Sequence, residues 1–462
     1  MTVRFIHWMR PAALLVLLAS TALPAIGAEN MHIPYTSFTL ANGLQVLVHE
    51  DHTLPLVSVN TWYHVGSGDE QPGRTGFAHL FEHIMFMGSQ HVPTGDFDKL
   101  LEAAGANNNG STTVDRTNYY EDGPAGALEL MLWLDADRMG YLLPEMTPEK
   151  VDLQRGVVKN ERRQSYENQP YGLAGENILS RLYPNAHPYS WPTIGSMADL
   201  TAATIDDVKN FFRHYYTPNN ATMVVAGDVK PAEVKRLVEK YFADIPRGPE
   251  VSRPVAPAVH LDADVVHTLE DRVQLPRLYH AWHTVKAFAP ADAALDAVAG
   301  ILSSGKSSRL YHRLVYQMEI ASQVAAYQDG GKLDGRFMLY ATAKPGHDLN
   351  ELQAVIDAEV RTLAESGPTQ RELDRFKHST ESRFIETLES LGGMYGRADQ
   401  LNFYNYFTGR PDFMAEDFAR YAKLTPADVQ RAAKSYLADP HRVVLSVVPQ
   451  GKTELAATGG AR

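Results

Sequence analysis

The sequence predicts an α+β fold made of two related domains, each an antiparallel sheet packed with helices. Three observations lead to this prediction. Strand-like segments in the first half follow one another through tight turns, the two halves end in the same pattern, and a proline-rich stretch separates them. Consecutive strands joined by short turns favour antiparallel pairing, and therefore α+β rather than a doubly wound α/β sheet.

The first half begins with a predicted hairpin. Residues 38–40 and 44–48 have strand character, and Ala41-Asn42-Gly43 between them is a turn signal. Residues 57–63 alternate in polarity and predict a third strand, and a helix is expected over residues 76–86.

The ends of the two halves resemble each other. In the first, Thr201 or Thr204 is placed to cap a helix that precedes the strand at 222–227. In the second, Thr425 followed by Pro426 caps a helix that precedes the strand at 442–448. A degenerate repeat explains this pattern, although two unrelated α+β domains could also share such endings.

The proposed domain boundaries follow from the proline-rich stretch, which contains Pro246, Pro249, Pro254 and Pro257. Such proline density fits an extended linker. The expected division is a signal peptide at 1–28, a catalytic domain at 29–246, a linker at 247–260 and a non-catalytic domain at 261–462.

Composition limits the partners and the ligands. The chain has 462 residues and a formal net charge of -12, and this acidic balance argues against nucleic acid as a partner. There is no cysteine. A metal site would therefore have to use His, Asp and Glu, which suit zinc or a similar divalent ion.

The first 28 residues have the pattern of a secretory signal. Arg4 and Arg10 are followed by a mostly apolar run and then by small residues around Gly27. We therefore expect an exported protein, periplasmic or secreted. The alternative is a membrane anchor, but the apolar run is shorter than the ~20 residues that a span needs. No later segment is apolar enough, so no stable membrane span is expected.

The most informative stretch is His79-Leu80-Phe81-Glu82-His83. Residues three and four apart lie on one side of a helix, so both imidazoles can hold one metal ion. Glu82 is then expected to act as the catalytic base, accepting a proton from the metal's water and passing it to a leaving amine. The chemistry that this predicts is peptide-bond hydrolysis.

A third protein ligand is needed for catalytic zinc. Glu161, in a charged helix that begins near Thr147, is the best candidate, although spacing alone does not select it from the other acids. A chance occurrence of the five-residue motif is the alternative explanation. The apolar residues around it favour a real site, because Phe77, Leu80 and Ile84 form one side of an amphipathic helix.

Three segments together resemble the pitrilysin/insulinase family of zinc peptidases, which are inverzincins and include mitochondrial processing peptidase. The resemblance spans about residues 35–450. Its most specific parts are residues 76–89, with the H-x-x-E-H motif, residues 160–163, and residues 109–113 with 117–120.

The resemblance assigns roles to individual residues. It implies one Zn²⁺ per chain, held by His79, His83 and Glu161, with Glu82 as the catalytic base. Gln154 stands where the family has a glutamate that supports the ligands, and an amide carries no charge to do so.

The resemblance also implies that Asn109, Gly110, Ser111 and Thr112 form an edge strand that binds substrate backbone. Taken alone, this asparagine-rich segment is more typical of a polar turn.

The resemblance further implies a processing-peptidase-like architecture that acts on peptides or unfolded segments, as a homodimer or with a sister chain. The second half has no H-x-x-E-H motif. Two functions are therefore considered: an exported zinc endopeptidase, or a non-catalytic subunit that binds peptides or scaffolds a peptidase complex.

Overall fold

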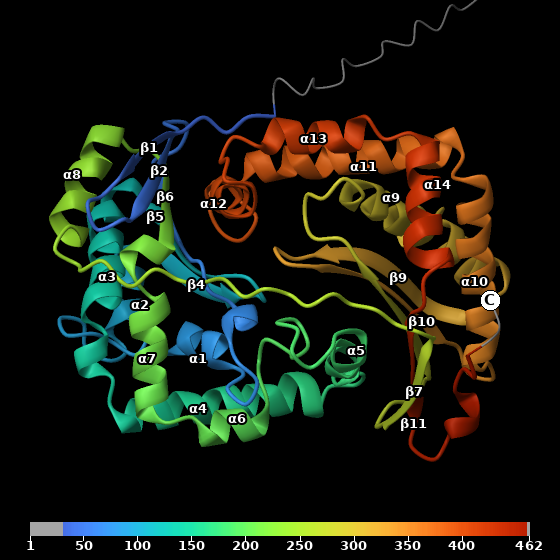
Figure 1. Ribbon diagram of the computed structural model, residues 1–462. Helices are drawn as coiled ribbons and strands as arrows, with labels where there is room; N and C mark the ends of the chain where they lie inside the picture. Colours follow the sequence, from blue (N-terminus) through green and yellow to red (C-terminus); the bar gives the residue numbers. More distant parts are fainter. Residues whose placement is uncertain (1–30, 460–462) are drawn as a thin grey trace, which may run out of the picture.

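The computed structural model describes residues 31–459 (Figure 1). The expected signal peptide at 1–28 lies outside the described residues. Within 31–459, no helix combines the length and the apolar character needed to cross a membrane.

The first half is built on a sheet of six strands in the order β1-β2-β6-β3-β5-β4. Neighbouring strands are antiparallel except for β2 and β6, which run parallel. The strands are β1 (Thr36–Thr39), β2 (Gln45–Glu50), β3 (Leu56–Tyr63), β4 (Asn107–Thr112), β5 (Thr117–Pro124) and β6 (Ala221–Gly227).

The second half has a sheet of five strands in the order β7-β11-β8-β10-β9, which corresponds to β2-β6-β3-β5-β4 of the first half. Here the parallel pair is β7 and β11. The strands are β7 (Val265–Asp271), β8 (Arg277–Thr284), β9 (Ala321–Gly330), β10 (Gly335–Ala343) and β11 (Val443–Pro449). The α+β prediction is confirmed, but each sheet is mixed rather than wholly antiparallel. The last strand of each half returns through helices, and such a crossover allows parallel pairing.

Helices flank both sheets. Those of the first half are α1 (Phe77–Ile84), α2 (Asp96–Ala103), α3 (Leu128–Tyr141), α4 (Pro148–Arg162), α5 (Ala174–Leu182), α6 (Met197–Ala202), α7 (Ile205–Tyr215) and α8 (Pro231–Phe242). Those of the second are α9 (Asp292–Ser303), α10 (Leu349–Ser366), α11 (Gln370–Glu389), α12 (Arg397–Thr408), α13 (Met414–Ala422) and α14 (Pro426–Ala433). Capping boxes begin α7 at Thr204 and α14 at Thr425, as the repeated endings predicted.

Each sheet is covered partly by a helix from the other half (Figure 1). Helices α3 and α8 pack on the first sheet, and α12 of the second half packs against β3 and β6. Conversely, α5 of the first half packs against β8 and β11. Leu401 of α12 and Ile178 of α5 are buried in the two apolar clusters formed by this exchange. Neither half therefore buries its own sheet alone.

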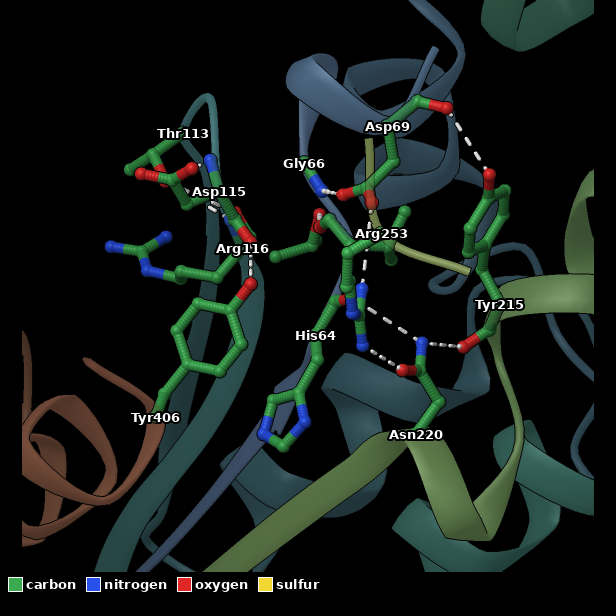
Figure 2. A network of polar contacts seen from close by, with 12 residues as sticks. His64, Gly66, Asp69, Thr113, Asp115, Arg116, Tyr215, Asn220, Arg253 and Tyr406 are labelled. Atoms are coloured by element: carbon green, nitrogen blue, oxygen red, sulfur yellow. Dashed lines mark hydrogen bonds and ion pairs between the residues drawn. The ribbon is translucent and has the colours of Figure 1, made fainter. Parts of the chain in front are cut away.

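The tips of the two edge hairpins, β4–β5 and β9–β10, are joined at Asp115. Its carboxylate accepts hydrogen bonds from the Tyr189 hydroxyl and from the backbone N–H of Lys332, at 2.9 Å. Its carbonyl oxygen accepts one from the Tyr406 hydroxyl, at 2.9 Å (Figure 2). Gly331 permits this approach, because a Cβ there would lie 2.5 Å from the Tyr189 hydroxyl.

The stretch at 247–260 contains no helix or strand and is tied to the first half by Arg253. Figure 2 shows its guanidinium between His64 and Asn220. It donates to the carbonyl of His64 and to Oδ1 of Asn220, and it lies 3.4 Å from Oδ1 of Asp69. Burial raises the pKa of Asp69 to about 6. Because Arg253 makes these contacts, the connection at 247–260 lies along the surface of the first half.

We expect Tyr189→Phe to destabilise the fold by about 1–3 kcal/mol, because buried polar groups of Asp115 and Leu333 would lose their partner. Urea unfolding measures this change. Tyr316→Phe is the matched control, because its side chain is exposed and its hydroxyl makes no hydrogen bond within residues 31–459. Equal stability of the two variants would contradict the role given to Tyr189.

A second prediction concerns Asp334, at the tip of the β9–β10 hairpin. Burial raises the pKa of Asp334, but hydrogen bonds from His187 and His283 outweigh this and bring it to about 2. Its ordinary value is 3.8. The ionised carboxylate therefore stabilises the fold fully above about pH 4, and this contribution is lost as the pH falls through 2.

Asp334→Asn should lower the free energy of unfolding by about 2 kcal/mol near pH 6, and by progressively less towards pH 2. Urea midpoints across this pH range measure the difference, with exposed Asp262→Asn as the control. A loss that does not depend on pH would contradict the assignment.

Candidate metal centre

Helix α1 carries the motif, and its first turn is fixed by a buried carboxylate. Glu70 accepts hydrogen bonds from the backbone N–H groups of Gly76 and Ala78, at 2.9 and 2.8 Å. Burial raises the pKa of Glu70 to about 8, against the lowering effect of these N–H donors. Gly76 has a φ of 90°, and a Cβ there would lie 2.7 Å from the Ile194 carbonyl oxygen. Sequence reasoning missed Glu70, although an acid shortly before a helix is a capping signal.

The apolar side of α1 determines which way the histidines face. Leu80, Phe81 and Ile84 are buried in the core of the first half, and Phe81 stacks on Phe211. The opposite side of the helix therefore carries His79 and His83 toward α4, which lies against it.

The three predicted ligands come together. Nε2 of His79 lies 3.6 Å from Oε1 of Glu161, and Nε2 of His83 lies 3.2 Å from Oε2 of Glu161. The donor atoms all lie within 4.8 Å of one another. Within residues 31–459, no other group of three His, Asp or Glu residues has this geometry.

The donor set fits a divalent metal ion. Burial lowers the pKa of His79, which favours the neutral imidazole. The hydrogen bond from His83 lowers the pKa of Glu161, which favours its carboxylate. Two neutral imidazoles and one carboxylate are a known zinc donor set that leaves a fourth position open. The Nδ1 atom of His79 is buried and has no hydrogen-bond partner, so neither of its ring nitrogens is held elsewhere within the described residues.

Glu82 lies beside the three ligands and outside their group. The Thr112 hydroxyl donates a hydrogen bond to its Oε2 atom, at 2.6 Å. A Cβ on Gly110 would lie 3.1 Å from Cγ of Glu82, so the glycine leaves the carboxylate more space than an alanine would. Thr112 was expected among the substrate-binding residues, and in the structure its side chain bonds Glu82.

Strand β4 contains all four residues expected to contact substrate, and the alternative reading of this segment as a polar turn is wrong. Strand β4 lies at the edge of its sheet, and β5 is its only strand neighbour within the described residues. Asn109 is exposed and accepts a hydrogen bond from the N–H of Gly110. The carbonyl of Ser111 accepts one from Arg116, at 2.8 Å. Their contact with substrate stays a prediction.

Gln154 lies on α4 but does not contact a ligand through a hydrogen bond. Its Nε2 atom donates to the sulfur of Met87. The supporting contact that the resemblance implied is therefore not made to His79, His83 or Glu161 in this structure.

Comparisons with known proteins agree with this geometry. The family model "Insulinase (Peptidase family M16)" matches residues 45–192, and "Peptidase M16 inactive domain" matches residues 202–380. The zinc protease PqqE of Helicobacter pylori is 32% identical over 443 residues, which cover 94% of this chain and 98% of that protein. The chain belongs to the M16 peptidase family. The resemblance to pitrilysin and insulinase is thereby confirmed.

Other members extend the comparison. A probable mitochondrial-processing peptidase subunit beta of Arabidopsis thaliana is 25% identical over 89% of the M16 chain and 78% of its own length. The crystal structure of a protease from Helicobacter pylori has a TM-score of 0.84 and 29% identity, and covers 90% of this chain and 100% of its own. A peptidase M16 inactive domain from Pseudomonas fluorescens, at 18% identity, has a TM-score of 0.79 over 92% of this chain and all of its own. It therefore shares the fold.

The geometry predicts that Glu161→Gln weakens zinc binding at least tenfold, because a neutral amide replaces a ligand carboxylate. Gln154→Ala on the same helix should keep its zinc, because Gln154 is bonded to Met87. Equilibrium dialysis followed by elemental analysis measures both. Zinc lost in Gln154→Ala and kept in Glu161→Gln would overturn the choice of ligands.

Proposed function

We propose that this M16 chain is a zinc-dependent endopeptidase that hydrolyses peptides or unfolded segments. The observation that carries the proposal is the convergence of His79, His83 and Glu161, with Glu82 beside them and outside the ligand group. A site that only stored or sensed a metal would not need a carboxylate held in that position. The names of the relatives, which are zinc proteases, support the same chemistry.

Zinc bound at this centre would act as a Lewis acid on a peptide carbonyl and would lower the pKa of a water molecule. The carboxylate of Glu82 serves as the general base. The Thr112 hydroxyl occupies Oε2, so Oε1 is available to take a proton from the attacking water. The same carboxylic acid then donates that proton to the leaving amine.

Strand β4 supplies the means to hold an extended peptide. An unpaired strand edge offers backbone N–H and C=O groups, and a peptide can add to it as a further strand. Gly110 has no side chain between this edge and Glu82. A peptide bond aligned on β4 would therefore have direct access to the carboxylate.

The alternative, a non-catalytic subunit that binds peptides or scaffolds a complex, is not favoured. Such a chain has no need of a base, yet the three ligands are grouped and Glu82 lies beside them. The second half holds no comparable metal group within its described residues, so we assign catalysis to the first half and leave the second non-catalytic.

Export and a second chain are also part of the proposal. The charged and apolar pattern at 1–28 supports a periplasmic or secreted protein. The resemblance to processing peptidases supports a second copy or a sister chain. Fractionation of cells and light scattering of the purified protein test these two statements.

Glu82→Gln should lower the cleavage of a mixed peptide library by roughly 10²–10⁴-fold, because an amide cannot accept the proton. Its zinc content should stay that of the unaltered protein. Exposed Glu102→Gln is the control and should keep full activity. Equal cleavage by Glu82→Gln and the unaltered protein would refute the role of Glu82. Cleavage that needs an added sister chain would show an obligate partner.

A further inference from the structure

The second half contains a place that corresponds to the metal centre. The strand orders β2-β6-β3-β5-β4 and β7-β11-β8-β10-β9 match position for position, including the parallel pair and the edge strand. Helices α1 and α4 lie below β4, and α9 and α11 lie above β9 (Figure 1). Helix α9 contacts both β9 and α11, as α1 contacts both β4 and α4. The equivalent of the metal centre is therefore the junction of α9, α11 and β9.

A cavity of about 450 Å³ opens at this junction. Its charged lining consists of Asp296 from α9, with Arg375 and Arg383 from α11. Its other polar lining residues carry hydroxyl groups: Ser304, Ser307, Tyr327 and Ser379. Two guanidinium groups repel a metal cation, so the cavity has the character of an anion site.

The two arginines of this cavity are not paired with a carboxylate within the described residues. Nη2 of Arg375 is buried and has no hydrogen-bond partner. Arg383 is exposed and donates only to the Thr380 hydroxyl, at 3.1 Å, and neither arginine forms an ion pair within residues 31–459. The neighbouring Arg420, by contrast, is paired with both Asp292 and Asp417. A carboxylate bound in the cavity would supply the ion pair that both arginines lack, and a guanidinium pairs well with a planar anion.

The one carboxylate in the cavity is engaged elsewhere. Asp296 accepts a hydrogen bond from the Tyr421 hydroxyl, at 2.7 Å. Burial raises the pKa of Asp296 to about 7, and the negative charge of Asp292 acts in the same direction. Asp296 therefore neutralises only part of the charge of the two arginines near neutral pH.

The edge of β9 limits which peptides can enter. The Ala326 N–H donates to Oγ of Ser303 at 2.7 Å, and this hydroxyl lies 3.3 Å from the Ala326 carbonyl. The backbone of β9 is thus capped beside the cavity, and a peptide cannot continue along it there as an added strand. A chain end is accommodated more readily than a continuous strand, and its planar carboxylate matches the fork of a guanidinium.

We propose that this cavity binds the C-terminal carboxylate of a peptide, through Arg375 and Arg383. The proposal deepens the proposed function, because it names a feature of the peptide that such a peptidase would recognise. It assigns the second half a binding role at the position equivalent to the catalytic centre of the first.

Binding is tested without cleavage, on the full-length Glu82→Gln protein. Fluorescence anisotropy compares three labelled peptides: one with a free C-terminal carboxylate, the same peptide with a C-terminal amide, and an amidated peptide with a glutamate near its end. The free acid should bind about tenfold more tightly than either amide, as expected for loss of a charge-assisted hydrogen bond. Equal affinity of the free acid and the plain amide would overturn the proposal. Equal affinity of the free acid and the glutamate peptide would overturn the assignment to a chain end.

Variants then locate the site. Arg375→Gln and Arg383→Gln, each added to Glu82→Gln, should abolish the preference for the free acid and leave the affinity for the amide unchanged. Arg371→Gln, an exposed arginine on the same helix and outside the cavity lining, is the control. A preference that survives both substitutions would place the carboxylate elsewhere. The Glu82→Gln protein alone already compares the free acid with the amide. The test of carboxylate binding therefore does not depend on the folding of the arginine variants. If the unaltered protein fails to cleave peptides even with a sister chain, while Glu82→Gln still prefers the free acid, the proposed function is refuted and this site is retained.

Discussion

The contact of Asp115 with the second half is the constraint on which the rest of the arrangement depends. This residue lies between β4 and β5, and its buried carboxylate reaches the tip of the β9–β10 hairpin. The strand that positions Thr112 and Gly110 beside Glu82 is therefore held from the opposite half of the molecule. A charge this buried is stable only while its hydrogen-bond donors stay in place. The shape of the candidate active site thus depends on contacts between the halves.

The candidate centre divides its tasks among different elements. Helix α1 carries the two candidate imidazole ligands and the proposed base, α4 carries the third candidate ligand, and β4 carries the hydroxyl that bonds Glu82. Glu70 accepts hydrogen bonds from backbone N–H groups at the start of α1, which stabilises the first turn of the helix that carries the motif. Precise placement of this kind is what general-base chemistry requires.

Much of this organisation was predictable from local sequence. The apolar face of α1 predicted on which side His79 and His83 lie, and threonine caps predicted the starts of α7 and α14. The contacts of Asp115 and Gln154 were not predictable, because each joins residues that only the tertiary fold brings together. The cap made by Glu70 is local in sequence and was missed. Spacing alone also could not select Glu161, which required the resemblance. The parallel pairs were missed because strand patterns carry no direction.

The exchange of α5 and α12 between the halves has a consequence for biosynthesis. The first sheet is complete in sequence at Gly227, but the helix that covers its second face ends only at Thr408. A ribosome adds roughly 5–20 residues per second. Apolar residues of β6 such as Val224 would thus remain uncovered for on the order of ten seconds or more after they emerge. Chaperone binding during that interval would protect the nascent chain from aggregation.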